Sequence, residues 1–169
     1  MGTPVEGRPS ELPRARNVLD FLGPPETIGG MADDIILGPD VFVNASVALG
    51  SPPEHVIRRV LQPGKKTKST EWIVQRIEAM LHNVESFKKD AIDRQMKTIL
   101  QFLDLVDDDE HGPDAWTEAL VAAAKAAGLK RVVTDHPDLA DKDEVDGIEF
   151  LSSEAWLVEV TTPPPPPGT

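Results

Sequence analysis

The sequence predicts an α/β fold, a three-layer sandwich of helices around a short, mainly parallel sheet. Three short apolar runs typical of buried strands lie at residues 34–37, 131–134 and 148–151. Segments with the apolar spacing of amphipathic helices separate the first two runs, and another follows the third. The chain has 169 residues, which suits one domain with short appendages. Such alternation favours parallel strands covered by helices.

Both ends of the chain are rich in proline. Residues 1–32 contain prolines and several glycines, and we interpret them as an extension in which residues 18–22 can dock as a short turn. Residues 161–169 include five consecutive prolines, which predicts an extended polyproline tail. The folded domain is therefore expected at residues 33–160.

The composition restricts the compartment and the classes of site. The chain has no Cys, which excludes disulfides and zinc–thiolate sites and fits a reducing compartment. No basic segment followed by an apolar run begins the chain, and no apolar stretch approaches the roughly 20 residues that span a bilayer. We expect a soluble, cytoplasmic protein without a membrane partner. The formal net charge of −12 disfavours broad, nonspecific binding to nucleic acid, but a metal-dependent nuclease stays open.

The first half of the domain predicts helices with clear ends. Residues 41–49 read as a buried helix closed by Gly50. Residues 51–54 form a capping box that begins a second helix. Ser69 or Thr70 caps a third, and a further apolar stripe predicts a fourth. The two stripes consist of Ile73, Ile77, Met80, Leu81, Val84 and Phe87, and of Ile92, Met96, Ile99, Leu100 and Leu103.

The second half predicts an acidic loop, a helix and two strands. Residues 107–112 make the loop, and an alanine-rich helix from residue 114 to 127 ends at Gly128. The strands at 131–134 and 148–151 follow. Ser152 and its neighbours then begin a last short helix.

Acidic side chains follow the ends of the predicted strands. Asp40 comes after the first strand, Asp135 and Asp138 come after the second, and Asp114 begins the alanine-rich helix. In sheets of this kind, ligands bind beyond the carboxyl ends of the strands. This topology can therefore bring acids from distant parts of the sequence together.

The carboxyl-terminal half resembles the closing half of a PIN domain. In residues 112–139 an Asp begins a helix, a strand ends in Thr, and an Asp-rich turn ends in Asp138 and Leu139. Residues 147–152 resemble the last strand of that family. The resemblance extends over residues 33–160, because residues 35–45 are similar to its opening strand and Asp-x-Asn turn, and residues 50–53 to a stretch common in its toxins.

This resemblance implies a Mg²⁺- or Mn²⁺-dependent ribonuclease, often the toxin of a toxin–antitoxin pair. Carboxylates hold the hard cations, and the metal activates water and stabilises the charge on the phosphoryl group. Asp40, Asp114 and Asp138 would be catalytic. The implied metal ligands are Asp40, Glu78, Asp114, Asp135 and Asp138. RNA would be the substrate, an antitoxin a partner, and a homodimer would fit the family.

Three positions depart from the family pattern. Gly38 takes the place of the leading Asp, so Asp40 falls on the Asn position. Gln75 or Arg76 lies closest to the mid-chain Glu, for which Glu78 or Glu71 would substitute from an adjacent turn. His136 replaces a usual Asp. A second function therefore stays open, namely a PIN-like module that has lost catalysis and acts through protein contacts.

Each candidate ligand also has a purely structural explanation. Asp114 and Asp40 are suitable helix caps, and residues 135–138 are a good turn sequence. Glu78 suits a solvated helix face. His136 suits an exposed turn, although it could also carry protons or bind a metal.

Overall fold

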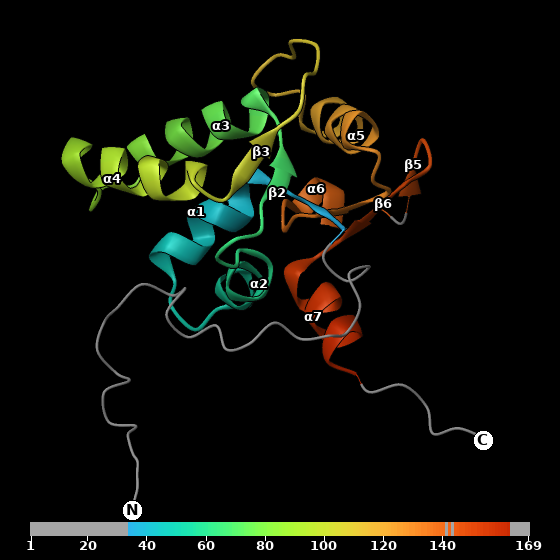
Figure 1. The fold of residues 1–169 in the computed structure, drawn as a ribbon, viewed down its shortest axis with the longest axis horizontal. Coiled ribbons are helices and arrows are strands. Elements are labelled where there is room, and N and C mark those ends of the chain that lie inside the picture. The colour runs from blue at the N-terminus through green and yellow to red at the C-terminus, as the bar shows by residue number, and fades with distance from the viewer. Residues whose placement is uncertain (1–33, 141, 143, 163–169) are drawn as a thin grey trace, which may run out of the picture.

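The computed structural model describes residues 34–140, 142 and 144–162, and within them the chain is a mixed α/β fold (Figure 1). The expected extension at 1–32 and the prolines of the expected tail lie outside the described residues. The elements follow in the order β1 (Ile36–Leu37), α1 (Pro39–Val47), α2 (Pro52–Val60), β2 (Thr67–Ser69), α3 (Glu71–His82), α4 (Lys89–Leu100), β3 (Leu103–Leu105), α5 (Trp116–Ala127), β4 (Arg131–Val133), α6 (Pro137–Ala140), β5 (Glu144–Val145), β6 (Ile148–Leu151) and α7 (Ser153–Thr161).

The main sheet is small and mostly parallel. Its order is β1-β4-β6-β5, in which β1, β4 and β6 are parallel and β5 is antiparallel to β6. A second, two-stranded sheet pairs β2 with β3 in parallel, and β2 lies beside β1. The α/β class and the mainly parallel sheet predicted from the sequence are confirmed.

Three strands escaped prediction from the sequence. Strands β2 and β3 have three residues each and β5 has two, too few to display a period. Leu103 follows the helical spacing of α4, but it lies in β3, since α4 ends at Leu100. β5 turns into β6 through Asp146 and Gly147, which both have positive φ angles (54° and 84°), as a tight hairpin turn requires.

The predicted helices form, but several of their bounds differ from the prediction. α5 begins at Trp116 instead of residue 114, and α1 ends at Val47 instead of residue 49. α1 begins at Pro39, two residues earlier than expected, because proline is preorganised for a first helical turn. The capping box of α2 does not form. Instead, the Ser51 hydroxyl donates to the Ala48 carbonyl, while the buried Glu54 carboxylate accepts from the Gly50 amide and pairs with Arg58 at 3.3 Å.

Other caps follow the sequence. Thr70 accepts from the Ile73 amide at 3.4 Å, and Ser152 accepts from the Ala155 amide at 3.0 Å. Gly128 ends α5 with a φ of 74°, in the left-handed region that glycine adopts without strain.

A continuous apolar core joins the helices to both sheets. Both residues of β1, together with Val132 and Val133 of β4, are buried, and so are Leu120 of α5 and Trp156 of α7. Helices α3 and α4 pack against each other and extend to one side of the sheets (Figure 1). Among the described helices, none combines the length and the apolar character needed to cross a bilayer.

Candidate functional site at the strand ends

The carboxyl ends of β1, β4 and β6 lie at one edge of the main sheet. Parallel pairing continues past the strands, because the Gly38 amide donates to the Val133 carbonyl at 2.8 Å and the Thr134 amide to the Leu151 carbonyl at 2.9 Å. The residues that follow each strand therefore meet at this edge, as expected for a parallel sheet.

Asp40 lies in the first turn of α1 and is buried, with 6% of its surface exposed. One carboxylate oxygen, Oδ1, accepts from the Thr134 hydroxyl at 2.7 Å, and Oδ2 accepts from the Asp135 amide at 2.7 Å. Burial raises the pKa of Asp40, against the opposing effect of these two hydrogen bonds, and the nearby charge of Asp135 raises it further. The side chain does not cap α1, whose N-cap is Gly38, but ties α1 to the end of β4.

Asp135 continues the connection towards β6. Its Oδ1 accepts from the Ser153 amide at 2.8 Å, and its Oδ2 accepts from the Ser153 hydroxyl at 2.6 Å. Ser153 is the first residue of α7, so the carboxylate lies at the positive end of that helix. Asp40, Thr134, Asp135 and Ser153 thus form one hydrogen-bonded chain across three strand ends, which we call the strand-end network.

The side chains of Asp40 and Thr134 lie so close to the backbone at position 38 that only glycine fits there without a shift. A Cβ atom at position 38 would lie 2.7 Å from Oδ1 of Asp40 and 3.0 Å from both Cβ and Oγ1 of Thr134. The space that an acidic side chain would need at position 38 is therefore filled by the carboxylate of Asp40.

His136 is oriented by the backbone around it. Its amide donates to Oγ1 of Thr134 at 3.2 Å, and its Nδ1 accepts from the Asp138 amide at 3.2 Å. Because Nδ1 accepts this hydrogen bond, the neutral ring carries its proton on Nε2. A metal binds only a ring nitrogen without a proton, so this tautomer offers no ligand atom at Nε2. The ring lies 4.6 Å from that of Trp116, which in turn meets Trp72 edge to face at 5.7 Å.

The other predicted ligands do not join this network. Glu78 is exposed on α3 and lies 3.9 Å from Nε2 of His82. Glu71, its alternative, begins α3 and is also exposed. Asp114 is exposed and precedes α5, whose N-cap is Ala115, so it does not cap that helix. Asp138 is exposed in α6.

The expected metal set is thus only partly assembled. Of the five predicted ligands, the structure joins Asp40 and Asp135. In the part of the chain that the structure describes, no group of three or more His, Asp or Glu side chains is arranged to hold a metal ion. Mg²⁺ and Mn²⁺ take about six oxygen ligands, usually one or two carboxylates and several waters. All four carboxylate oxygens of Asp40 and Asp135 already accept hydrogen bonds from the protein, so these residues do not fit such an ion.

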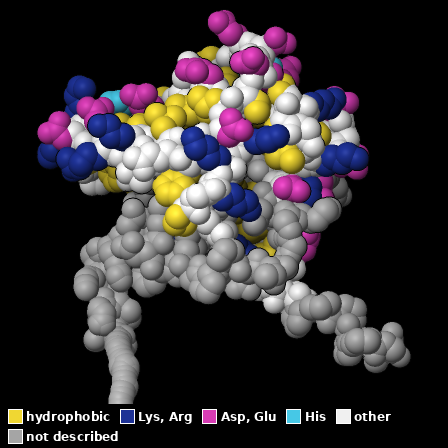
Figure 2. Space-filling view, viewed as in Figure 1, with side chains coloured by type: hydrophobic (Ala, Val, Ile, Leu, Met, Phe, Trp, Pro, Cys, Tyr) yellow, Lys and Arg dark blue, Asp and Glu magenta, His cyan; other side chains and the backbone are white. Residues whose placement is uncertain are grey.

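A second group of acidic side chains lies beside this edge. Asp107, Asp109 and Glu110, together with Glu71 of α3, line a hollow of about 540 Å³ that also contains Trp72. Figure 2 shows acidic side chains gathered over the loop between β3 and α5. Within the loop, Asp108 is bonded to His111 at 3.2 Å, and the Trp72 indole donates to the Gly112 carbonyl at 2.9 Å. These two contacts fix the carboxyl-terminal end of the predicted acidic loop.

Two members of the network were not predicted as site residues. Thr134 was seen only as the end of a strand, and Ser153 only as part of a helix start. The available signal was their position, because a hydroxyl residue one or two positions after a parallel strand lies at the same edge as the acids.

Comparison with known proteins adds no relative: no protein-family model matches the chain, and no curated protein matches it.

Proposed function

We propose that the chain is a catalytically impaired, PIN-like module that acts through protein contacts. The main observation behind this proposal is that the carboxylates of the strand-end acids are already hydrogen-bonded within the protein. All four carboxylate oxygens of Asp40 and Asp135 accept hydrogen bonds from the protein itself. The acids that a nuclease would use to hold a cation here connect elements of the fold.

The arrangement of the sheet supports the PIN-like part of the proposal. The strand order, with β2 beside β1 and acids at the carboxyl ends of β1 and β4, suits a three-layer sandwich of that kind. Both departures at the strand ends also have a physical explanation. Gly38 leaves space for the carboxylate of Asp40, and His136 is held by the Asp138 amide.

The charge of the chain supports a protein partner over RNA. The net charge of −12 repels a phosphate backbone at long range. On the face drawn in Figure 2, Lys and Arg side chains are interspersed with Asp and Glu, and no continuous basic surface is visible among the described residues.

The alternative function is the metal-dependent endoribonuclease, and one pair of measurements separates the two. We would incubate the full chain with a fluorescent single-stranded RNA in Mn²⁺ or Mg²⁺, and record thermal melts with and without Mn²⁺. Binding to the folded state raises the midpoint, so the module is expected to give no shift and no cleavage. Metal-dependent cleavage that Asp114→Ala abolishes, with the fold intact, would establish the nuclease instead.

A variant designed to bind Mn²⁺ serves as a positive control for the expected absence of a thermal shift in the native chain. Gly38→Asp, Asp40→Ala and His136→Asp together place acids at the two strand-end positions that depart from the family pattern and remove the Asp40 carboxylate that fills the space beside position 38. The triple variant is expected to show a Mn²⁺-dependent rise in the midpoint of about 2 °C or more, in contrast to the native chain. The matched control is Gly38→Asp alone, in which the new carboxylate meets that of Asp40 and is expected to destabilise the fold.

A further inference from the structure

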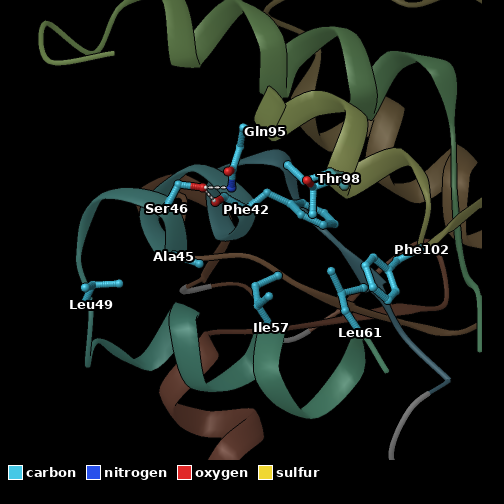
Figure 3. Close-up of a pocket in the computed structure, with 10 residues that line it drawn as sticks. Phe42, Ala45, Ser46, Leu49, Ile57, Leu61, Gln95, Thr98 and Phe102 are labelled. Atoms are coloured by element: carbon cyan, nitrogen blue, oxygen red, sulfur yellow. Dashed lines mark hydrogen bonds between the residues drawn. The ribbon is translucent and has the colours of Figure 1, made fainter. Parts of the chain in front are cut away.

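An apolar groove lies away from the strand-end network, between α1, α2 and the end of α4 (Figure 3). Its volume is about 270 Å³. Apolar side chains make up most of its lining, and polar atoms enter through three residues. The lining includes the apolar residues Phe42, Leu49 and Ile57 and the polar residues Ser46, Gln95 and Thr98.

Two of the three polar residues in the groove wall bond to each other. Gln95 donates through Nε2 to the Ser46 hydroxyl at 2.8 Å, and that hydroxyl donates to the Phe42 carbonyl at 2.9 Å (Figure 3). These groups therefore have little to offer a polar ligand. Leu49 at the rim is 79% exposed and the neighbouring Val47 is 45% exposed. Apolar surface of this kind is energetically favourable to cover.

The chain itself contains a matching apolar segment. Residues 18–22 read Val-Leu-Asp-Phe-Leu, with four apolar side chains in five positions. This segment lies outside the described residues. In the extension it follows a proline-, glycine- and charge-rich stretch, and it is the densest apolar run before β1.

The connection is long enough for the segment to reach the groove. Because α1 follows β1 directly, the lengths of strand and helix place Ser46 no more than about 30 Å from Asp34. The eleven residues between position 22 and position 34 give twelve Cα–Cα steps, which can extend over about 40 Å. A tether of this length also gives a high effective concentration of the segment at the groove.

We propose that residues 18–22 dock in the groove between α1, α2 and α4 and cover Leu49. The occupant is a segment of the same chain, and the interaction is apolar. The proposal is independent of whether the strand-end network is catalytic, because the groove and the network share no residue.

The absence of native Cys makes a cross-linking test clean, since two introduced thiols are the only ones present. We would compare Leu19→Cys/Leu49→Cys with Leu19→Cys/Ala126→Cys in the full chain, where Ala126 is exposed on α5. Mild oxidation is followed by non-reducing electrophoresis and mass spectrometry. The Leu49 pair is expected to form an intrachain disulfide at least about tenfold faster than the Ala126 pair.

Two outcomes would overturn the proposal. Equal rates for the two pairs would mean that the segment has no preferred position. Disulfide-linked dimers as the main product at micromolar protein would mean that the segment of a second copy occupies the groove.

A thermal measurement supports the test without cross-links. Leu19→Ser/Phe21→Ser is expected to lower the midpoint by about 3 °C, because apolar area returns to water. Leu12→Ser, in the same extension but outside the segment, is the control and is expected to leave the midpoint unchanged. An unchanged midpoint in the double variant would contradict docking.

Discussion

At the residue scale, two hydrogen bonds offset part of the desolvation cost of the buried Asp40 carboxylate. Desolvation disfavours its charged form, and the Thr134 hydroxyl and the Asp135 amide oppose that effect. A charged group with such partners fixes the relative position of α1 and β4, because any displacement would leave it unpaired.

The raised pKa of Asp40 predicts a pH-dependent stability. The folded state binds this proton more tightly than the unfolded state, whose pKa is near 3.8. Stability contributed by the protonated group is therefore present at low pH and falls as the pH rises through the window above 3.8. In Asp40→Asn the side chain at position 40 carries no titratable carboxyl group. In melts from about pH 3.5 to pH 7, the midpoint of the native chain is expected to fall relative to that of the variant. A constant difference would contradict the prediction.

Gly38 predicts a coupling between neighbouring positions. Gly38→Ala would place Cβ 2.7 Å from Oδ1 of Asp40, and we expect a cost of about 2 kcal/mol in the free energy of unfolding. The cost should fall by about 0.5 kcal/mol or more in an Asp40→Ala background, as measured by a double-mutant cycle in urea. Gly112→Ala is the control, since nothing lies within 4 Å of a Cβ there. Additive effects at positions 38 and 40 would contradict the contact.

At the scale of elements, one carboxylate connects β4 to α7. Asp135 bonds both the amide and the hydroxyl of Ser153, while the N-cap Ser152 bonds the Ala155 amide. The start of α7 is thus satisfied from outside the helix as well as from within. The helix then buries Trp156 in the core.

Removal of this carboxylate should loosen the helix. Asp135→Ala loses two hydrogen bonds to a carboxylate, and the expected cost is about 2–3 kcal/mol in urea unfolding. Asp138→Ala is the control, because its side chain is exposed on α6, and its effect should stay within about 0.5 kcal/mol. Similar costs for the two variants would show that Asp135 has no special role.

At the scale of the whole molecule, charge is unbalanced. The chain has 29 acidic residues against 17 Lys and Arg. Several ion pairs among the described residues are exposed, such as Lys89 with Asp93, and contribute little. Net repulsion among the acids is therefore the larger electrostatic effect on folding.

Salt is expected to stabilise the protein for this reason. Raising NaCl from about 20 mM to about 500 mM shortens the screening length from roughly 20 Å to roughly 4 Å, which weakens the repulsion. The thermal midpoint should rise by a few degrees, as seen by circular dichroism. The control is the same series near pH 4.7, the isoelectric point, where the effect should largely disappear. A midpoint that falls with salt near neutral pH would mean that ion pairs dominate.

The sequence by itself determined the long helices, the buried strands β1, β4 and β6, and several of the helix caps. These features follow from local periodicity and from chemistry within a few residues, as with Thr70 before α3 and Gly128 after α5. It also indicated that parallel strand ends could bring Asp40, Asp114, Asp135 and Asp138 to one edge, and of these the structure joins Asp40 and Asp135.

Only the tertiary structure decided the partners of those two acids. Thr134 lies 94 positions from Asp40, and Ser153 lies 18 positions from Asp135, so no local pattern joins them. The strands β2, β3 and β5 also depended on tertiary pairing, since two or three residues have no period of their own. A hydrogen bond between distant side chains is fixed by how the sheet packs, and the packing is a property of the whole chain.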